Sequence, residues 1–222
     1  MKGLISASMM CANLIDLKET LKIFEEEKVD YLHIDVMDGE FVPNFGLGVD
    51  YIRCLRELTD IPLDIHLMVR NPEYKLQWIG IQQNDIVSVH FESTFQVQRA
   101  LDWLDQYGCK KFLAINPATP IYSLEEVLDY IDGVNLLMVN PGFAGQQIVG
   151  STLKKADKLR QFLIDNHRDN LIFEVDGNIS PKHAKILREK GADMFVTGTS
   201  SVFRGNVNDY RHNLNELRTI IG

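Results

Sequence analysis

The chain has 222 residues, 45% of them hydrophobic, which is enough for one large core or for two small domains. No linker rich in Pro, Gly or Ser and no low-complexity segment divides it, so we expect a single domain over residues 1–222. The formal net charge of −8 argues against a general nucleic-acid or anionic-membrane surface, because both require clustered Lys and Arg.

The cysteines and the N-terminus indicate the cellular compartment. Cys11, Cys54 and Cys109 lie far apart and form no C-x-x-C motif, which favours reduced thiols over a disulfide framework or a thiolate zinc site. Polar and charged residues interrupt the apolar N-terminal run too early for a signal peptide. No segment approaches the ~18 uncharged apolar residues of a membrane span. We therefore expect a soluble, cytoplasmic protein that has no nucleic-acid or membrane partner.

Short apolar runs alternate with segments of helical spacing along the whole chain. The predicted strands are residues 4–10, 31–37 (closed by a turn at Asp38-Gly39), 63–69, 85–90, 111–116, 134–139, 171–176 and 194–197. The predicted helices are residues 14–24 (with Asn13 as N-cap), 49–58, 71–82, 94–107, 123–130, 151–165, 180–190 and 207–220.

Eight strand–helix units with short connections predict a parallel sheet, and eight units in this length fit a closed (β/α)8 TIM barrel. An open doubly wound sheet is the alternative, but its central strands would be more continuously apolar. Here polar residues recur at the ends of the predicted strands, and in a barrel these ends meet at one rim, where active sites lie.

Two His and two Asp stand out at these strand ends. Alternation along a strand places His33, Asp35 and Met37 on one face, and the segment 63–68 repeats the pattern with His66. Asp176 ends a third apolar run. Each residue alone would suit a core histidine or a turn, but the four together predict a metal site. A mixed imidazole–carboxylate set suits one divalent Zn, Fe, Mn or Co ion.

Glycine-rich loops follow the last three predicted strands and lead towards helices. Exposed backbone N–H groups and helix N-termini bind phosphate at such places, and barrels commonly bind it after strands seven and eight. A single glycine would be an ordinary turn residue, whereas three adjacent loops predict a phosphate site. The residues concerned are Gly142, Phe143, Ala144, Gly145, Gly177, Asn178, Gly198, Thr199 and Ser200.

A series of motifs, in order along nearly the whole chain, resembles the ribulose-phosphate 3-epimerase family. They are His33-Ile34-Asp35-Val36-Met37-Asp38-Gly39, Asp64-Ile65-His66-Leu67-Met68, Asn116-Pro117-Ala118-Thr119-Pro120, Asn140-Pro141-Gly142-Phe143-Ala144-Gly145-Gln146 and Glu174-Val175-Asp176-Gly177. The resemblance implies a (β/α)8 barrel that inverts C3 of a phosphorylated ketose at a divalent metal. By the same resemblance His33, Asp35, His66 and Asp176 are the metal ligands, and the two Asp are also the acid/base pair.

The resemblance also implies substrate contacts at Ser8 and His66 and an apolar wall formed by Met37, Met68 and Met138. His90-Phe91-Glu92 fits either support of the site or a plain strand end. The expected reaction converts D-ribulose 5-phosphate to D-xylulose 5-phosphate.

Three departures from the family pattern bear on the substrate, namely Ser6-Ala7-Ser8, Ala144 and Asn178. Ala144 and Asn178 resemble the branch acting on D-allulose 6-phosphate, which would give D-fructose 6-phosphate. Asn tolerates left-handed backbone angles, so Asn178 can still offer its N–H group.

Other classes remain as alternatives. A metal-dependent hydrolase could use the same four ligands, and a non-catalytic sugar-phosphate binder could use the same loops. A lyase of the hexulose-phosphate synthase type is disfavoured, because Asp35-Val36-Met37-Asp38 lacks the Asp-x-Lys-x-x-Asp pattern. The native metal and the oligomeric state, homo-oligomers included, are not fixed by the sequence.

Overall fold

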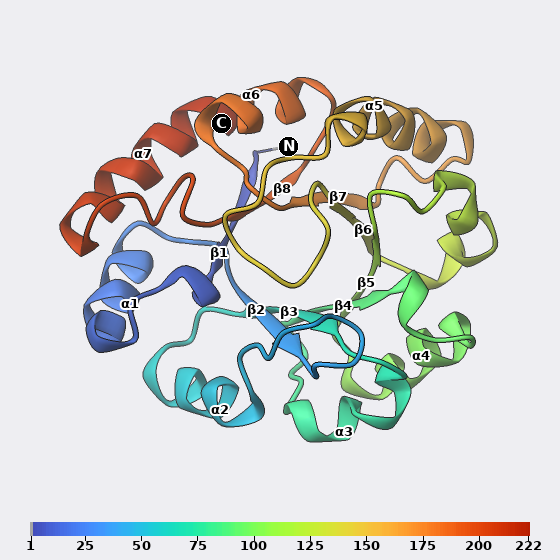
Figure 1. Ribbon diagram of the computed structural model, residues 1–222, viewed down its shortest axis with the longest axis horizontal. Helices are drawn as coiled ribbons and strands as arrows, with labels where there is room; N and C mark the ends of the chain where they lie inside the picture. The colour runs from blue at the N-terminus through green and yellow to red at the C-terminus, as the bar shows by residue number, and fades with distance from the viewer. Residues whose placement is uncertain (1) are drawn as a thin grey trace.

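The computed structural model describes residues 2–222, so Met1, the first residue of the predicted domain, lies outside the described residues. The strands close into a barrel in which every neighbouring pair is parallel (Figure 1). They are β1 (Leu4–Ser8), β2 (Tyr31–Met37), β3 (Leu63–Met68), β4 (Ile86–His90), β5 (Lys110–Ile115), β6 (Gly133–Leu137), β7 (Ile172–Asp176) and β8 (Met194–Thr197). The predicted (β/α)8 barrel is confirmed.

Helices surround this barrel on all sides (Figure 1). The α-helices are α1 (Leu17–Glu26), α2 (Val49–Leu58), α3 (Leu76–Ile79), α4 (Val97–Leu104), α5 (Gly150–Asp165), α6 (Pro181–Glu189) and α7 (Tyr210–Ile221). The 3₁₀ helices are Met9–Cys11, Leu14–Asp16, Pro72–Tyr74, Phe91–Ser93, Asp105–Tyr107, Ile121–Tyr130 and Val207–Asp209.

Two predicted helices differ in kind from those observed. The predicted helix over 71–82 is a 3₁₀ turn followed by the short α3, which ends where Gly80 adopts a left-handed conformation with φ of 73°. The predicted helix over 123–130 is the 3₁₀ segment Ile121–Tyr130. Its buried Leu124, Val127 and Leu128 show apolar spacing that suits both kinds of helix, so periodicity does not separate them.

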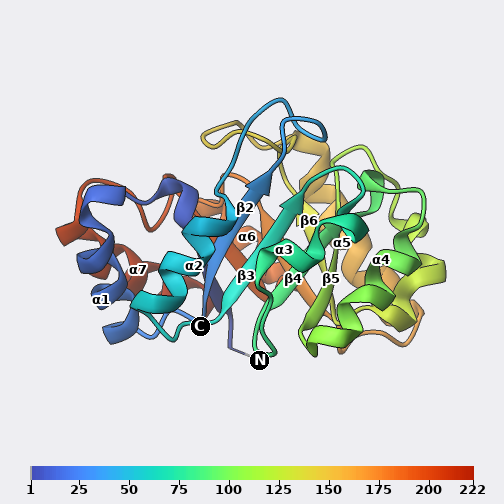
Figure 2. The same ribbon diagram turned by 90° about the horizontal axis from the view of Figure 1, so that it is seen from below.

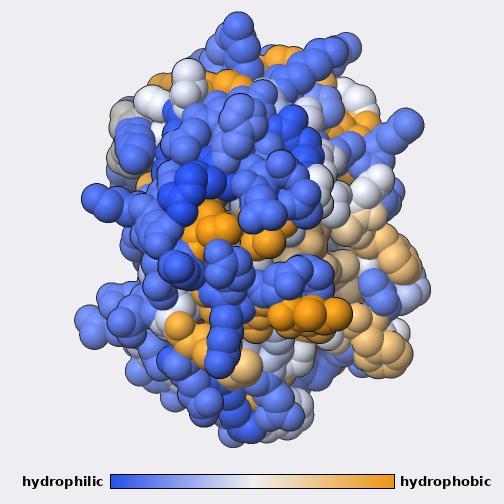
Figure 3. All heavy atoms as spheres, turned by 90° about the vertical axis from the view of Figure 1, so that its left-hand side faces the viewer, coloured by the Kyte–Doolittle hydropathy of each residue, from blue (hydrophilic) through white to orange (hydrophobic). Residues whose placement is uncertain are grey.

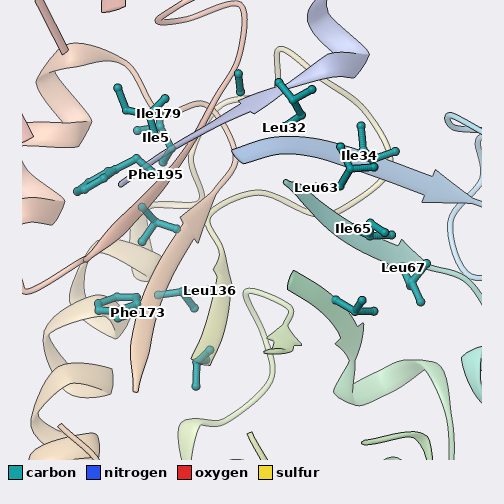
Figure 4. Packing of buried hydrophobic residues seen from close by; sticks show 14 of the residues in the cluster. Ile5, Leu32, Ile34, Leu63, Ile65, Leu67, Leu136, Phe173, Ile179 and Phe195 are labelled. Carbon is teal, nitrogen blue, oxygen red and sulfur yellow. The ribbon is translucent and has the colours of Figure 1, made fainter. Parts of the chain in front are cut away.

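The main core lies between the barrel and its helices. Side chains at alternate strand positions, such as Leu32, Ile34 and Ile65, are fully buried and belong to one apolar cluster with residues of the helices (Figure 4). Burying an aliphatic side chain of this size contributes about 1.5–3 kcal/mol. This outward packing turns the other set of strand residues, including His33 and Asp35, into the barrel.

The barrel interior changes character along its axis. Ile86, Phe112 and Met194 form a small apolar cluster near the strand beginnings. Further along the strands the interior is polar, and His33 and His66 are buried there. Both faces of β2 are therefore buried, and the hydrogen-bond partners of its polar side chains have to lie inside the barrel.

The long loops after β2 and β6 project from the end of the barrel towards which the strands run (Figure 2). The face shown in Figure 3 is mainly hydrophilic, with hydrophobic side chains in smaller groups. Among residues 2–222, no helix has the length and apolar character needed to cross a membrane.

Candidate active site

The four predicted metal ligands lie together where β2, β3 and β7 end. His33 and Asp35 come from β2, His66 from β3 and Asp176 from β7, and one ligand atom of each lies within 4.8 Å of the others. His33 Nε2 is 3.3 Å from Asp35 Oδ1 and 3.7 Å from Asp176 Oδ2. His66 Nδ1 is 3.2 Å and 3.4 Å from the same two oxygen atoms. Two nitrogen and two oxygen atoms thus converge on one point.

The donor set fits a divalent metal ion. His33 Nε2 is buried and has no hydrogen-bond partner among the described residues, although it points into this cluster. A buried polar atom without a partner is costly, and a metal ion at the centre of the cluster would satisfy it. Imidazole nitrogens with carboxylate oxygens suit Zn, Fe, Mn or Co.

A buried hydrogen-bond network supports His33 from behind. Its Nδ1 is 2.6 Å from Asp64 Oδ2, which also accepts a hydrogen bond of 2.7 Å from the Ser6 hydroxyl. Asp64 therefore accepts a hydrogen bond from the Nδ1–H group of His33, which leaves the Nε2 lone pair free for the metal. Glu174 lies on the other side of Asp64, and burial together with the charge of Asp64 raises its pKa well above the ordinary value. Glu174 is thus held neutral beside Asp64.

The buried charges of the cluster shift the pKa values of its members. Burial opposes the protonation of His33, but the charges of Asp64 and Asp35 outweigh it and raise the pKa of His33 well above its ordinary value. Burial also opposes protonation of His66, and hydrogen bonds with Asp176 and Asp35 raise its pKa. Burial alone would raise the pKa of Asp35, but the charge of His33 lowers it far below its usual range. Asp35 is therefore ionised.

A pocket opens directly above this cluster and brings the predicted substrate residues together. It is lined by Ser8, Asp35, Met37, His66, Met68, Gly142, Phe143, Ala144, Gly145, Asp176, Gly177, Asn178, Gly198, Thr199 and Ser200, among others. The Ser8 hydroxyl donates a hydrogen bond of 3.3 Å to Asp35 Oδ2. The loop between β6 and α5, gold in Figure 1, lies over the centre of the barrel. Metal cluster and glycine loops thus face one space.

The expected methionine wall differs at one position. Met37 and Met68 form a small cluster with Val42 at the pocket. Met138 instead is fully buried in the main core, and its neighbour Leu137 lines the pocket. Side chains alternate along β6, so when Leu137 faces inward Met138 must face the helices. The assignment of Met138 to the wall is therefore wrong.

The glycine loops have the geometry that exposes backbone N–H groups. Gly177 has φ of 111°, and a Cβ atom there would lie 2.7 Å from Val139 Cγ2, so only glycine fits. Asn178 has φ of 53°, in the left-handed region that Asn tolerates. After β8, however, the chain forms turns and α7 begins only at Tyr210, so no α-helix starts directly at Gly198. The expected helix N-terminus is absent from that loop.

Several site residues were not predicted. Asp64 lies two positions before His66 on the same strand face, so alternation alone could have placed it inside the barrel. His90 was left open, yet its Nε2 is 2.8 Å from His66 Nε2. Cys11 and Gln146 also line the pocket. Gln146 ends one of the motifs that resemble the family, whereas no pattern in the sequence distinguishes Cys11 from other loop residues.

Fold and site together define a (β/α)8-barrel enzyme whose catalytic end carries a cluster able to hold a metal ion. Among solved structures, 3-hexulose-6-phosphate synthase from Salmonella typhimurium matches with a TM-score of 0.72 and 14% identity, covering 100% of this chain and 98% of that one. At this identity the likeness concerns the fold alone.

Sequence comparison gives the family. The family model described as "Ribulose-phosphate 3 epimerase family" matches residues 4–203. A chloroplastic ribulose-5-phosphate-3-epimerase of Arabidopsis thaliana is 40% identical over 202 residues, which is 90% of this chain and 71% of the relative. Ribulose-phosphate 3-epimerase of Bacillus subtilis is 35% identical over 196 residues, 88% of this chain and 90% of the relative. The chain belongs to the ribulose-phosphate 3-epimerase family and is an epimerase, an enzyme of the isomerase class.

Proposed function

We propose that this protein inverts C3 of D-ribulose 5-phosphate to give D-xylulose 5-phosphate, using Asp35 and Asp176 as its acid/base pair. The convergence of these two carboxylates and two imidazoles beneath a glycine-lined pocket carries this proposal. The relatives described above bear the name of ribulose phosphate, which favours the five-carbon sugar. The six-carbon alternative suggested by Ala144 and Asn178 has no support among them.

His33 Nε2, His66 Nδ1, Asp35 Oδ1 and Asp176 Oδ2 would hold the metal ion. When bound, a divalent ion supplies Lewis-acid stabilisation of the negative charge that develops on the substrate oxygens. The protein holds the four ligand atoms within 4.8 Å of one another among buried residues. These side chains therefore need to move little when the ion binds.

Two carboxylates from different strands account for inversion. A proton next to a carbonyl is weakly acidic, and its removal leaves a flat enediolate that can be reprotonated from either face. Each carboxylate turns one oxygen towards the imidazoles, Oδ1 of Asp35 and Oδ2 of Asp176, and both residues line the pocket. The second oxygen of each would serve proton transfer, and in Asp35 this atom, Oδ2, also accepts the hydrogen bond from the Ser8 hydroxyl. One residue removes the C3 proton and the other delivers a proton to the opposite face.

The loops after β6, β7 and β8 would bind the phosphate group. Gly145, Gly177 and Asn178 have positive φ angles and lie at the pocket, and turns of this kind can present backbone N–H groups to an anion. These donors supply positive potential locally in an acidic protein. Phosphate bound by these loops would orient the sugar chain towards Asp35 and Asp176, which line the same pocket.

A side-by-side assay tests the proposed function. Purified protein with added Zn²⁺, Fe²⁺, Mn²⁺ or Co²⁺ is given ribulose 5-phosphate or allulose 6-phosphate, and the epimeric products and inorganic phosphate are measured. We expect xylulose 5-phosphate, a higher kcat/KM for the five-carbon substrate and no phosphate release. Phosphate release would indicate a hydrolase, and the absence of both product and C3 proton exchange would indicate a binding protein.

Metal binding should weaken at low pH. Ligand imidazoles must be neutral, and the pKa values of His33 and His66 are raised in the metal-free protein, so the metal ion has to displace protons. Affinity for Zn²⁺ should be constant above these pKa values and fall as the pH drops through them, by about tenfold per pH unit for each proton displaced. Titrations in buffers of different ionisation enthalpy measure the released protons. A dissociation constant independent of pH would contradict this ligand set.

Removing the phosphate group from the substrate should lower its kcat/KM and leave the metal bound to the protein. A hydrogen bond to a charged group contributes about 1.5–3 kcal/mol, so losing two of them should lower kcat/KM for free ribulose by roughly 10²–10⁴-fold. Metal content measured in the same samples is the control. Similar kcat/KM for the free and the phosphorylated ketose would exclude the glycine loops as a phosphate site.

We propose that the protein is cytoplasmic. Cys11, Cys54 and Cys109 are free in the described structure, and free thiols are compatible with a reducing environment.

A further inference from the structure

The two nitrogen atoms of His66 face different surroundings. Nδ1 points into the four-ligand cluster, 3.2 Å from Asp35 Oδ1. Nε2 points away from it and lies 2.8 Å from Nε2 of His90, whose ring plane is inclined by 25° to that of His66 with centroids 4.9 Å apart. Both rings are buried. His66 therefore meets another imidazole, whereas His33 meets the carboxylate of Asp64 directly.

The His90 ring leads on to a carboxylate. Its Nδ1 is 3.2 Å from Oε2 of Glu92. The other oxygen of that side chain, Oε1, accepts hydrogen bonds from the Asn116 N–H group at 2.9 Å and from the Thr119 hydroxyl. Glu92 is thus held between the histidine pair on one side and two donors of the loop after β5 on the other.

That loop is itself anchored. The amine of Lys155, on α5, donates hydrogen bonds to the Asn116 carbonyl at 2.8 Å and to the Thr119 carbonyl. The two donors that face Glu92 are therefore carried by a segment tied to a helix of the outer ring. The series of contacts runs without a gap from α5 to the metal ligand His66.

Only one assignment of protons satisfies this series with neutral imidazoles. A carboxylate can only accept, so Nδ1 of His90 carries a proton and donates it to Glu92. The Nε2 atom of His90 is then an acceptor, and Nε2 of His66 has to donate to it. The remaining lone pair of His66 lies on Nδ1, the atom that faces the cluster. The opposite assignment would place a proton on Nδ1 of His66 and block the metal.

We propose that Glu92 and His90 are positioning residues that select the tautomer of His66 in which Nδ1 is free to bind the metal ion. The proposal rests on the metal site of the proposed function. It assigns to the pair the task that Asp64 performs for His33, with one imidazole inserted between carboxylate and ligand. The outer partner of a ligating histidine orients its ring and sets its tautomer, and replacing it typically costs 10–100-fold in metal affinity.

Glu92→Gln tests the proposal, because the loop donors decide how the new amide lies. The Asn116 N–H group and the Thr119 hydroxyl need an acceptor, so the amide oxygen faces them and the NH₂ group faces Nδ1 of His90. Because the NH₂ group donates to Nδ1 of His90, the proton of His90 moves to Nε2. His90 then cannot accept the hydrogen bond from Nε2 of His66, and the tautomer of His66 that binds metal is no longer favoured. We expect the dissociation constant for Zn²⁺ to rise roughly 10–100-fold, measured by competition with a chelating dye.

Glu73→Gln is the matched control. Glu73 is also a buried carboxylate held by a hydroxyl, accepting a hydrogen bond of 2.9 Å from Thr94, but it lies outside the histidine series. Glu73→Gln makes the same chemical change as Glu92→Gln and should leave the zinc affinity unchanged. Zinc affinity of Glu92→Gln equal to that of the wild type would overturn the proposal, as would an equal loss in both variants.

Tautomers can also be read directly in the wild-type protein by long-range ¹H–¹⁵N correlation of its histidine rings, so the outcome does not depend on the folding of a variant. We expect the proton on Nδ1 of His90 and on Nε2 of His66 in the zinc-loaded protein. A proton on Nε2 of His90 would overturn the proposal while leaving the metal site intact. Wild-type protein that binds no Zn²⁺ would overturn the proposed metal site, and this proposal with it.

Discussion

Replacing Asp35 or Asp176 by Asn should lower kcat/KM by roughly 10²–10⁴-fold in both directions of the reaction, the range typical of general acid–base groups. Asparagine keeps the size of the side chain but cannot carry the proton. Each carboxylate serves one epimer as base and the other as acid, so neither can replace its partner. Kinetics with ribulose 5-phosphate and with xylulose 5-phosphate measure the effect.

The metal content of both variants has to be measured, because Asp35 and Asp176 are also proposed ligands. Asp102→Asn, on the exposed side of α4, makes the same substitution away from the site and should retain full activity. Near-normal epimerisation by either site variant would exclude a mechanism with two carboxylates. A variant with full metal and lost activity would separate proton transfer from metal binding.

Replacing His33 or His66 by Ala should remove metal and activity together. Each variant takes one of the two nitrogen atoms from the cluster, and the neutral imidazoles are the ligands that distinguish this site from a purely carboxylate one. The loss of zinc affinity should exceed the 10–100-fold expected for a supporting residue such as Glu92. Elemental analysis of the purified protein and zinc titration measure it.

His212→Ala, at an exposed position of α7, is the control for this pair. The alanine variants also remove one hydrogen-bond partner of Asp64 or of His90, so thermal unfolding of each variant has to be recorded beside its metal content. Full metal occupancy in both His33→Ala and His66→Ala, in folded protein, would show that the ion binds elsewhere.

The site could be predicted where the sequence alternates between apolar and polar residues. In β2 and β3 the apolar residues Leu32, Ile34 and Ile65 alternate with His33, Asp35 and His66, so the inward face was evident. The residues next to Met138 are apolar and give no signal, and the inward face is marked only by the polar Asn135, two positions before Leu137. That is why Leu137 was missed and Met138 was assigned wrongly.

The residues that support the metal ligands could not be predicted, because their contacts depend on residues far apart in the sequence. His90 meets His66 because β3 and β4 pair in a register that sets His66 beside Ser88, so that His90 lies one inward position further along. Glu92 then meets Asn116 and Thr119, which are more than twenty residues away in sequence. Such contacts follow from strand register and loop placement, which are fixed only when the barrel closes.

The central claim, inversion of C3 by two carboxylates, is tested most directly by wild-type turnover in D₂O, started separately from each epimer and stopped at low conversion. When one residue removes the proton and the other delivers a solvent-derived one, the product carries deuterium at C3 and the recovered substrate does not. We predict this labelling from both epimers. Product that retains the original C3 hydrogen from either epimer would contradict the account.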